Sequence, residues 1–362
     1  MSLIEETKLP ELSHAQAVQE VYKYTPQIRD YDRFMHCGAR WLPYTMYFHE
    51  KSFFSEAVNT DALGFRYTYF NGDRCSVAEC PDGMAINLLV GGSTALGVGA
   101  CSDQATVASK LSEQTGEVWL NFAGRGFNAT QEVIMFLMHQ KKFTKINRVV
   151  VLSGLNTLAL EGIPEEFSSD HGRYYYSFEF QHYMNKFNDD MKRKKEGFDG
   201  SGSRALKKLK FWEVNEENPA DKVIDDSHVT LADRIDRAAE NTAQALKQWS
   251  LLLTDHGIKP TFFLQPLSYW CDKPMTADES GVFHAIDSCP NNFYRLFGNV
   301  LGKEVHKPFY EAICSKAQGI ACHDVNMLLR SSSLMQETIF VDRVHFNDPG
   351  NAEVARLISD QI

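Results

Sequence analysis

Between residues 85 and 154 the chain alternates short, mainly apolar runs with longer segments of mixed polarity. The apolar runs are 85–92, 117–124 and 147–154, and the segments between them are 105–116 and 129–143. A short apolar run that ends at glycine is typical of a parallel strand buried on both faces. The mixed segments have the composition of helices, and the first ends at Gly116, a candidate C-cap. The pattern therefore predicts a β-α-β-α-β unit.

The same alternation returns after residue 229. Apolar residues recur at helical spacing from Thr230 to His256, with Thr230 as candidate N-cap and Gly257 after the helix end. The other predicted elements are strands at 260–267 and 319–325 and a helix at 307–318. Alternating strands and helices predict an α/β fold with a parallel sheet covered on both faces. Such sheets bind their ligands at the carboxyl ends of the strands.

We expect the chain to consist of an N-terminal extension packed on the core (1–80), a core in two pieces (81–158 and 229–362) and an insertion (159–228). The extension is rich in aromatic residues but has weak periodicity. The insertion holds a cluster of tyrosine and phenylalanine residues and the basic run 191–195, which we interpret as a solvated surface. We expect the insertion to form a cap beside the pocket, with a surface excursion or an oligomer contact as the alternatives.

Composition narrows the class of protein. The 362 residues are 43% hydrophobic and 23% charged, as in globular proteins. The formal net charge of −10 argues against nucleic-acid binding, which depends on basic contacts to phosphate. No apolar run is long enough for a membrane span, and the N-terminus lacks a signal-peptide pattern. The eight cysteines show no C-x-x-C or zinc-type spacing, so we expect a cytoplasmic protein with reduced thiols and no bound metal.

Residues that can act together in catalysis follow the predicted strands. Ser93 follows the first, Gly126 the second and Asn156 the third, and Asp342 precedes His345 by three positions near the C-terminus. A serine hydroxyl becomes a good nucleophile when an imidazole takes its proton, and a carboxylate holds the imidazole in the right tautomer. The N–H groups of Ser93 and Gly126 and the amide of Asn156 are candidate donors to an oxyanion. This combination predicts acyl-transfer chemistry.

These pieces resemble, in their order, the four blocks of the SGNH (GDSL-like) hydrolase superfamily. Gly91-Gly92-Ser93 is similar to the first block, and the segment 121–126 is similar to the second. Gly154-x-Asn156 is similar to the third block and Asp342-x-x-His345 to the last. The resemblance covers roughly residues 85–158 and 230–358. It implies a flavodoxin-like three-layer α/β/α sandwich and a mechanism without cofactor or metal. It also implies roles for five residues: Ser93 as nucleophile, His345 as general base, Asp342 as its orienter, and Gly126 and Asn156 in the oxyanion hole.

The sequence departs from the family pattern at two positions. Position 92 is glycine where the family name spells aspartate, which is not a catalytic group. Position 157 is threonine where the third block usually ends in aspartate, which implies weaker support around Asn156.

Single motifs of the chain also have other interpretations. The stretch around Ser93 lacks the lysine of a phosphate loop, the G-x-G-x-x-G spacing of a dinucleotide turn and the G-x-S-x-G of an α/β-hydrolase. Taken alone, Ser93 would be a helix N-cap and Asn156 a turn residue. We interpret Asp348 as an N-cap followed by Pro349, and Arg125 as a surface residue, with a side chain that faces the substrate as the alternative. Gln265, which ends the fourth strand, is a candidate substrate-binding residue.

We therefore expect a serine esterase that cleaves an acyl ester, acetyl among the candidates, of a small molecule, glycan or lipid through an acyl-Ser93 intermediate. An acyltransferase or thioesterase would use the same site, and the sequence does not separate these from hydrolysis. A non-catalytic glycan- or lipid-binding module and a nucleotide-binding protein are the alternatives from other classes. Acyl chain length and oligomeric state are not predicted.

Overall fold

The computed structural model describes residues 12–37, 40–42, 46–80, 83–162, 229–288, 298–300 and 302–362. At its centre is a five-stranded sheet in the order β6-β5-β7-β8-β9, with every neighbouring pair parallel. The strands are β5 (Ala85–Gly91), β6 (Trp119–Ala123), β7 (Lys145–Ser153), β8 (Thr261–Leu264) and β9 (Ala321–Asp324). In chain order this is the 2-1-3-4-5 arrangement of flavodoxin-like folds. The α/β fold with five predicted strands is thus confirmed.

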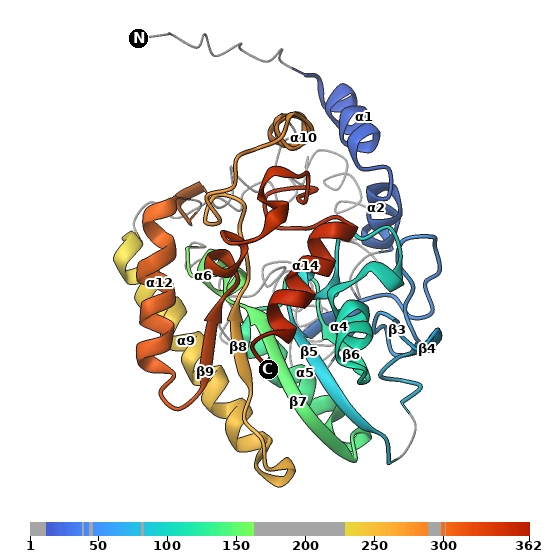
Figure 1. Cartoon of the computed structure of the whole chain (residues 1–362), viewed down its shortest axis with the longest axis vertical. Coiled ribbons are helices and arrows are strands. Elements are labelled where there is room, and N and C mark those ends of the chain that lie inside the picture. The colour runs from blue at the N-terminus through green and yellow to red at the C-terminus, as the bar shows by residue number, and fades with distance from the viewer. Residues whose placement is uncertain are drawn as a thin grey trace, which may run out of the picture.

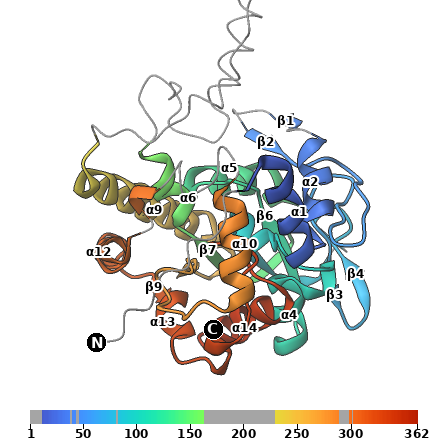
Figure 2. The same ribbon diagram turned by 90° about the horizontal axis from the view of Figure 1, so that it is seen from above.

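Helices cover both faces of the sheet, which makes three layers (Figures 1 and 2). One face carries α5 (Ala129–His139), α6 (Leu155–Leu160), α9 (Leu231–Leu252) and α12 (Lys303–Lys316). The other carries α3 (Ser93–Leu96), α4 (Val107–Thr115), α13 (Val325–Leu329) and α14 (Asp348–Ser359). Leu88 and Val90 of β5 belong to the first hydrophobic cluster and Leu89 to the second. Burial on both faces explains why the strand sequences are apolar without alternation.

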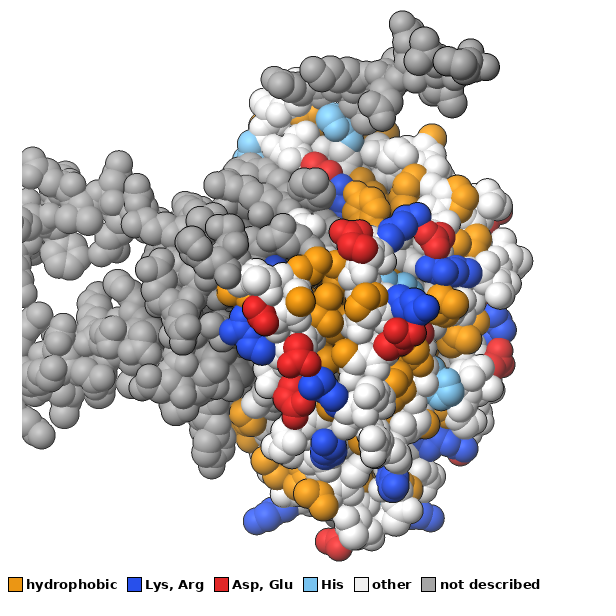
Figure 3. Space-filling view, turned by 90° about the vertical axis from the view of Figure 1, so that its left-hand side faces the viewer, with side chains coloured by type: hydrophobic (Ala, Val, Ile, Leu, Met, Phe, Trp, Pro, Cys, Tyr) orange, Lys and Arg blue, Asp and Glu red, His pale blue; other side chains and the backbone are white. Residues whose placement is uncertain are grey.

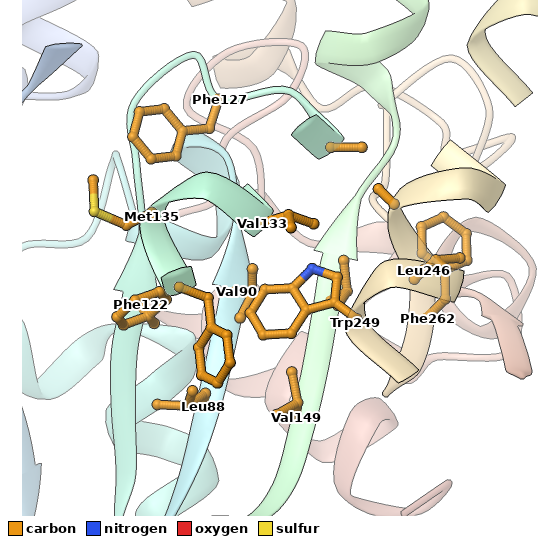
Figure 4. Packing of buried hydrophobic residues seen from close by; sticks show 14 of the residues in the cluster. Leu88, Val90, Phe122, Phe127, Val133, Met135, Val149, Leu246, Trp249 and Phe262 are labelled. Atoms are coloured by element: carbon orange, nitrogen blue, oxygen red, sulfur yellow. The ribbon is translucent and has the colours of Figure 1, made fainter. Parts of the chain in front are cut away.

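The packing between α9 and the sheet shows how the first layer is held (Figure 4). The indole of Trp249 lies between Val133 of α5 and Val149 of β7, and Trp249 is completely buried. Its ring centroid is 4.7 Å from that of Phe136. Large aromatic side chains bury the most apolar surface per residue, so this contact anchors α9 after the long excursion that separates it from α6.

Helix ends agree with the sequence patterns in part. The Thr230 hydroxyl accepts a hydrogen bond from the Asp233 N–H at 3.1 Å, and α4 ends directly before Gly116, both as predicted. The helix predicted at 129–143 instead ends at His139 and continues as a 3₁₀ turn. The helix predicted to begin at 307 begins at Lys303 and contains Pro308. Burial of Val305 and His306 holds this first turn in place and outweighs the usual preference of proline for a helix start.

The N-terminal region folds as short elements: α1 (His14–Tyr24), α2 (Ile28–His36), hairpin β1 (Arg40–Leu42) with β2 (Met46–Phe48), and hairpin β3 (Thr68–Phe70) with β4 (Asp73–Cys75). Helix α1 lies beside α10 (Ala277–Asp287), as Figure 2 shows. Phe48 and Phe65 belong to the same cluster as Phe122 of β6. The buried ion pair between Arg66 and Asp103, at 2.8 Å, further ties this region to the core.

Residues 163–228, most of the predicted insertion, lie outside the described residues, so the domain boundaries and the cap stay predictions. On the described part of the face that carries α9 and α12, acidic and basic side chains are interspersed (Figure 3). Across the described ranges no helix is both long and apolar enough to cross a bilayer. Within those same ranges no three histidine, cysteine, aspartate or glutamate side chains are grouped as metal ligands.

Candidate active site

The predicted site residues lie at the carboxyl edge of the sheet, around the point where the strand order reverses. Strand β5 pairs with β6 on one side and with β7 on the other. Ser93 comes two residues after the end of β5, Gly126 follows β6, and Asn156 follows β7. Parallel sheets of this kind have their ligand crevice at this switch point, because the connections leave the sheet in opposite directions there.

Ser93, His345 and Asp342 form a hydrogen-bonded chain. Ser93 Oγ lies 2.7 Å from His345 Nε2, and His345 Nδ1 lies 2.6 Å from Asp342 Oδ2. A carboxylate can only accept, so Nδ1 carries the ring proton and Nε2 accepts the Ser93 hydroxyl proton. Ser93 is the first residue of α3, whose N-cap is Gly92. Its hydroxyl therefore does not cap the helix, so the alternative interpretation of Ser93 as a helix N-cap is wrong.

Asp342 is held in the turn that precedes His345. Its Oδ1 accepts the backbone N–H groups of Val344 and His345, both at 2.8 Å. Burial opposes ionisation of this carboxyl, but the His345 ring and these N–H groups outweigh burial, so the pKa of Asp342 lies below its usual value. The carboxylate is therefore ionised near neutral pH and faces the ring that it orients.

The turn that carries His345 is also tied to the turn that carries Ser93. The Thr94 hydroxyl donates a hydrogen bond to the Val344 carbonyl at 3.0 Å. Helix α14 begins differently from the prediction: its N-cap is Asn347, whose side chain accepts from the Gly350 N–H at 3.0 Å. Asp348 is the first helical residue, and its carboxylate accepts from the Cys101 N–H at 2.8 Å. Asn347 and Asp348 are both good N-cap residues by sequence, and only the tertiary contact with Cys101 distinguishes them.

Three N–H donors border Ser93. The backbone N–H groups of Ser93 and Gly126 have no hydrogen-bond partner within the described part of the chain. The Asn156 side-chain nitrogen donates one hydrogen bond to the Phe127 carbonyl at 2.9 Å, which leaves its second N–H free. Gly126 has φ of 68°, a left-handed conformation that glycine adopts without strain.

The two departures from the family pattern have structural explanations. A Cβ on Gly92 would lie 2.5 Å from Asn156 Nδ2, so a side chain at position 92 would displace that amide. The Thr157 hydroxyl accepts the Ala129 N–H at 3.1 Å. Asn156 is thus supported by the Phe127 carbonyl, without an aspartate at position 157.

The N-terminal extension reaches the site through the backbone N–H and C=O groups of Arg125. The Tyr47 hydroxyl donates to the Arg125 carbonyl, and the Arg125 N–H donates to His49 Nε2 at 3.0 Å. His49 Nδ1 lies 3.0 Å from the Gly64 carbonyl, so Nδ1 carries the proton and Nε2 is the acceptor. Burial, together with the nearby Arg125 charge, lowers the pKa of His49 to about 3, so the ring is neutral.

Sequence analysis did not find Tyr47 and His49. They lie 78 and 76 residues before Arg125, in a region with weak periodicity. No local motif marks either residue. Only contacts within the folded protein identify them.

An open pocket of about 200 Å³ lies in front of Ser93 and His345. Its lining residues come from the N-terminal extension and from all the predicted site turns: Met35, Tyr47, Ser93, Val98, Arg125, Gly126, Leu155, Asn156, Gln265, Val344 and His345. Gln265 is among them, while its amide also donates to the Thr94 hydroxyl at 3.2 Å. Arg125 is half-buried and lines the pocket, which agrees with the alternative interpretation of this residue and not with a surface position. The turn after β6 directs it inward because Tyr47 and His49 hold its backbone.

Comparison with known proteins gives remote structural likenesses only. Est24, a carbohydrate acetylesterase from Sinorhizobium meliloti, is 11% identical with a TM-score of 0.39, over 76% of this chain and 97% of that one. The acetyl xylan esterase AlAXEase is 11% identical with a TM-score of 0.36, over 76% and 99%. The lipase Lip_vut3 from a goat rumen metagenome is 11% identical with a TM-score of 0.39, over 76% and 96%. No family model and no curated protein matches the sequence. Likenesses this remote carry no functional argument.

Proposed function

We propose that the protein is a serine esterase that cleaves an acyl ester through an acyl-Ser93 intermediate. One observation carries the proposal: the 2.7 Å contact from Ser93 Oγ to His345 Nε2 continues into the 2.6 Å contact from His345 Nδ1 to Asp342. A hydroxyl, an imidazole and a carboxylate in this order form the arrangement that activates serine for attack on a carbonyl. The order of the motifs supports membership of the SGNH (GDSL-like) superfamily.

In the first half-reaction Ser93 Oγ attacks the ester carbonyl carbon while His345 Nε2 takes the hydroxyl proton. Asp342 stays ionised and stabilises the imidazolium that forms. When the tetrahedral intermediate collapses, the bond to the alcohol oxygen breaks. His345 gives its proton to that oxygen, and the acyl group stays on Ser93.

In the second half-reaction a water molecule replaces the alcohol. His345 takes a proton from the water, and the resulting hydroxide attacks the acyl carbon. Collapse of this second intermediate breaks the bond to Ser93 Oγ, which recovers its proton from His345. The products are a carboxylic acid and an alcohol, and the enzyme returns to its starting state.

Both tetrahedral intermediates carry a negative oxygen that needs donors already in position. The N–H groups of Ser93 and Gly126 and the free amide hydrogen of Asn156 are suited to this role because the three residues line the same pocket. Loss of one such donor typically costs about 3 kcal/mol of transition-state stabilisation. The pocket, at about 200 Å³, is smaller than the ~300–1,000 Å³ typical of drug-sized ligands, which favours a short acyl group such as acetyl.

The test combines covalent labelling with turnover. A fluorophosphonate should modify the wild-type protein at Ser93, located by peptide mass spectrometry, and should not modify Ser93→Ala. Hydrolysis of p-nitrophenyl esters of increasing chain length should be fastest for acetate. A folded wild-type protein that is neither labelled nor active on any of these esters would contradict the proposal. Transfer of the acyl group to an added alcohol in preference to water would identify the protein as an acyltransferase and not an esterase.

A further inference from the structure

Arg125 presents a charged group to the pocket without an oxygen acceptor to receive it. Its Nε is buried and makes no hydrogen bond, and its Nη1 lies against the Met35 sulfur, which is a weak acceptor. Within the described ranges no carboxylate forms an ion pair with it. By contrast, the buried Arg343 forms a two-pronged contact with Asp287.

An arginine in this setting is costly unless a ligand completes it. The guanidinium has five N–H donors in a rigid fork and cannot lose its charge at physiological pH. Burying a charged group without partners is unfavourable, because it loses hydration and gains no compensating contact. Among the described residues that line the pocket, Arg125 is the only one with a permanent charge. The remaining lining is largely apolar, which strengthens the interaction with an incoming anion.

We propose that Arg125 binds an anionic group, a carboxylate or a phosphate, that the ester substrate carries close to its scissile bond. The inference rests on the proposed function, because it places this anion in the same pocket as Ser93. The Arg125 backbone is held on both sides, by Tyr47 and by His49, so the side chain starts from a fixed position. Its neighbour Gly126 is the proposed oxyanion donor, which places the anion next to the reacting carbonyl. The preferred substrates are therefore esters of acidic molecules.

The test compares esters that differ only in charge, with the anion in the acyl part or in the alcohol part. The acyl pair is ethyl hydrogen succinate and ethyl succinamate, and the alcohol pair is 4-acetoxybenzoate and 4-acetoxybenzamide. In at least one pair the wild-type protein should prefer the carboxylate in kcat/KM by about 10- to 100-fold, as expected for a charge-assisted hydrogen bond. Arg125→Gln should bring that ratio close to one.

A matched control is Arg148→Gln, because Arg148 pairs with Glu117 at the opposite end of the strands. This variant should keep the wild-type ratio. A ratio near one in both pairs for the wild type, or a preference that survives Arg125→Gln, would overturn the inference. In either case hydrolysis of the neutral esters would leave the proposed esterase function standing, whereas no hydrolysis and no labelling of Ser93 would overturn both.

A second measurement needs no variant and covers the case in which Arg125→Gln does not fold. Benzoate and benzamide are each added while a fluorophosphonate labels Ser93 in the wild-type protein. Benzoate should protect Ser93 at a concentration at least about tenfold lower than benzamide does. Equal protection by the two compounds would contradict an anion site at Arg125.

Discussion

The phenol of Tyr47 donates a hydrogen bond to the backbone carbonyl of Arg125, 78 residues further along the chain. That carbonyl belongs to the peptide unit that also contains the N–H of Gly126. In a trans peptide the C=O and N–H bonds point in opposite directions, so holding one fixes the direction of the other. Tyr47 thus aims the N–H that we propose as an oxyanion donor, from a part of the chain outside the motifs.

We expect Tyr47→Phe to lower kcat by about tenfold with little change in KM. Outright loss of an oxyanion donor costs about 10²–10³ in kcat, and a donor that is only less well aimed should cost less. The affinity for a tetrahedral boronate inhibitor should fall in parallel with kcat, since both depend on the negative oxygen. Steady-state kinetics and inhibition constants provide the measurements.

The control for Tyr47→Phe is Tyr67→Phe, which removes a comparable hydrogen bond, to Glu79 at 2.7 Å, in the same N-terminal region. It should leave kcat and boronate affinity at the wild-type level. If both variants lowered kcat equally, Tyr47 would act through the stability of the extension and not through the peptide.

Gly92→Ala should lower kcat by displacing the Asn156 amide, which a Cβ at position 92 would meet at 2.5 Å. We expect a loss approaching that of Asn156→Ala, about 10²-fold. Because both changes remove the same donor, the double variant should be no slower than Asn156→Ala alone. Additive losses in this double-mutant cycle would refute the explanation. Gly298→Ala is the matched control, because a Cβ there meets nothing within 4 Å.

Asp342→Asn should lower kcat/KM by about 10⁴-fold, the scale of effect expected when an imidazole loses the carboxylate that fixes its tautomer. The asparagine oxygen can still accept the N–H groups of Val344 and His345, so the turn should keep its shape and the melting temperature should change little. Asp348→Asn, which alters a nearby carboxylate at the start of α14 that accepts a hydrogen bond from the Cys101 N–H, should retain activity. Comparable losses in the two variants would argue against the role of Asp342.

Glu132→Gln should stabilise the protein increasingly as pH rises. Glu132 is completely buried behind Ser153, and burial raises its pKa from 4.5 to about 8, although the Ser153 hydroxyl partly opposes this. The folded state therefore keeps a proton that the unfolded state releases. The contribution of Glu132 to the stability of the folded protein is full below pH 4.5 and is lost as pH rises to about 8. The loss amounts to about 1.4 kcal/mol per pH unit across this window.

Glutamine mimics the protonated form and does not titrate. Melting temperatures measured from pH 5 to pH 9 should therefore show the variant gaining steadily over the wild type. Glu113→Gln, at an exposed position paired with Lys110, should show no such trend. Parallel curves for Glu132→Gln and wild type would mean that the Glu132 pKa is not raised.

The sheet was predictable because strands that are buried on both faces consist of short apolar segments, which can be recognised in the sequence. The runs that became β5, β6 and β7 are apolar on both faces, and their ends mark where the site turns must lie. The pairing of Asp342 with His345 was also predictable, because three residues of turn bring the two side chains together. Short elements of the N-terminal extension were not, since strands of three residues leave no periodic pattern.

Local patterns in the chain were enough to predict the α/β architecture, the carboxyl edge of the sheet as the place of the site, and Ser93, His345 and Asp342 as candidate catalytic residues. Long-range packing was needed to show that Tyr47 and His49 hold the carbonyl and the N–H of Arg125, that Asn156 occupies the space left by Gly92, and that Arg125 faces the pocket. The difference comes from the distance along the chain over which the interactions act. Apolar periodicity and turn spacing act between neighbours in the chain, whereas the direction of a peptide or a guanidinium depends on side chains that packing brings from distant positions.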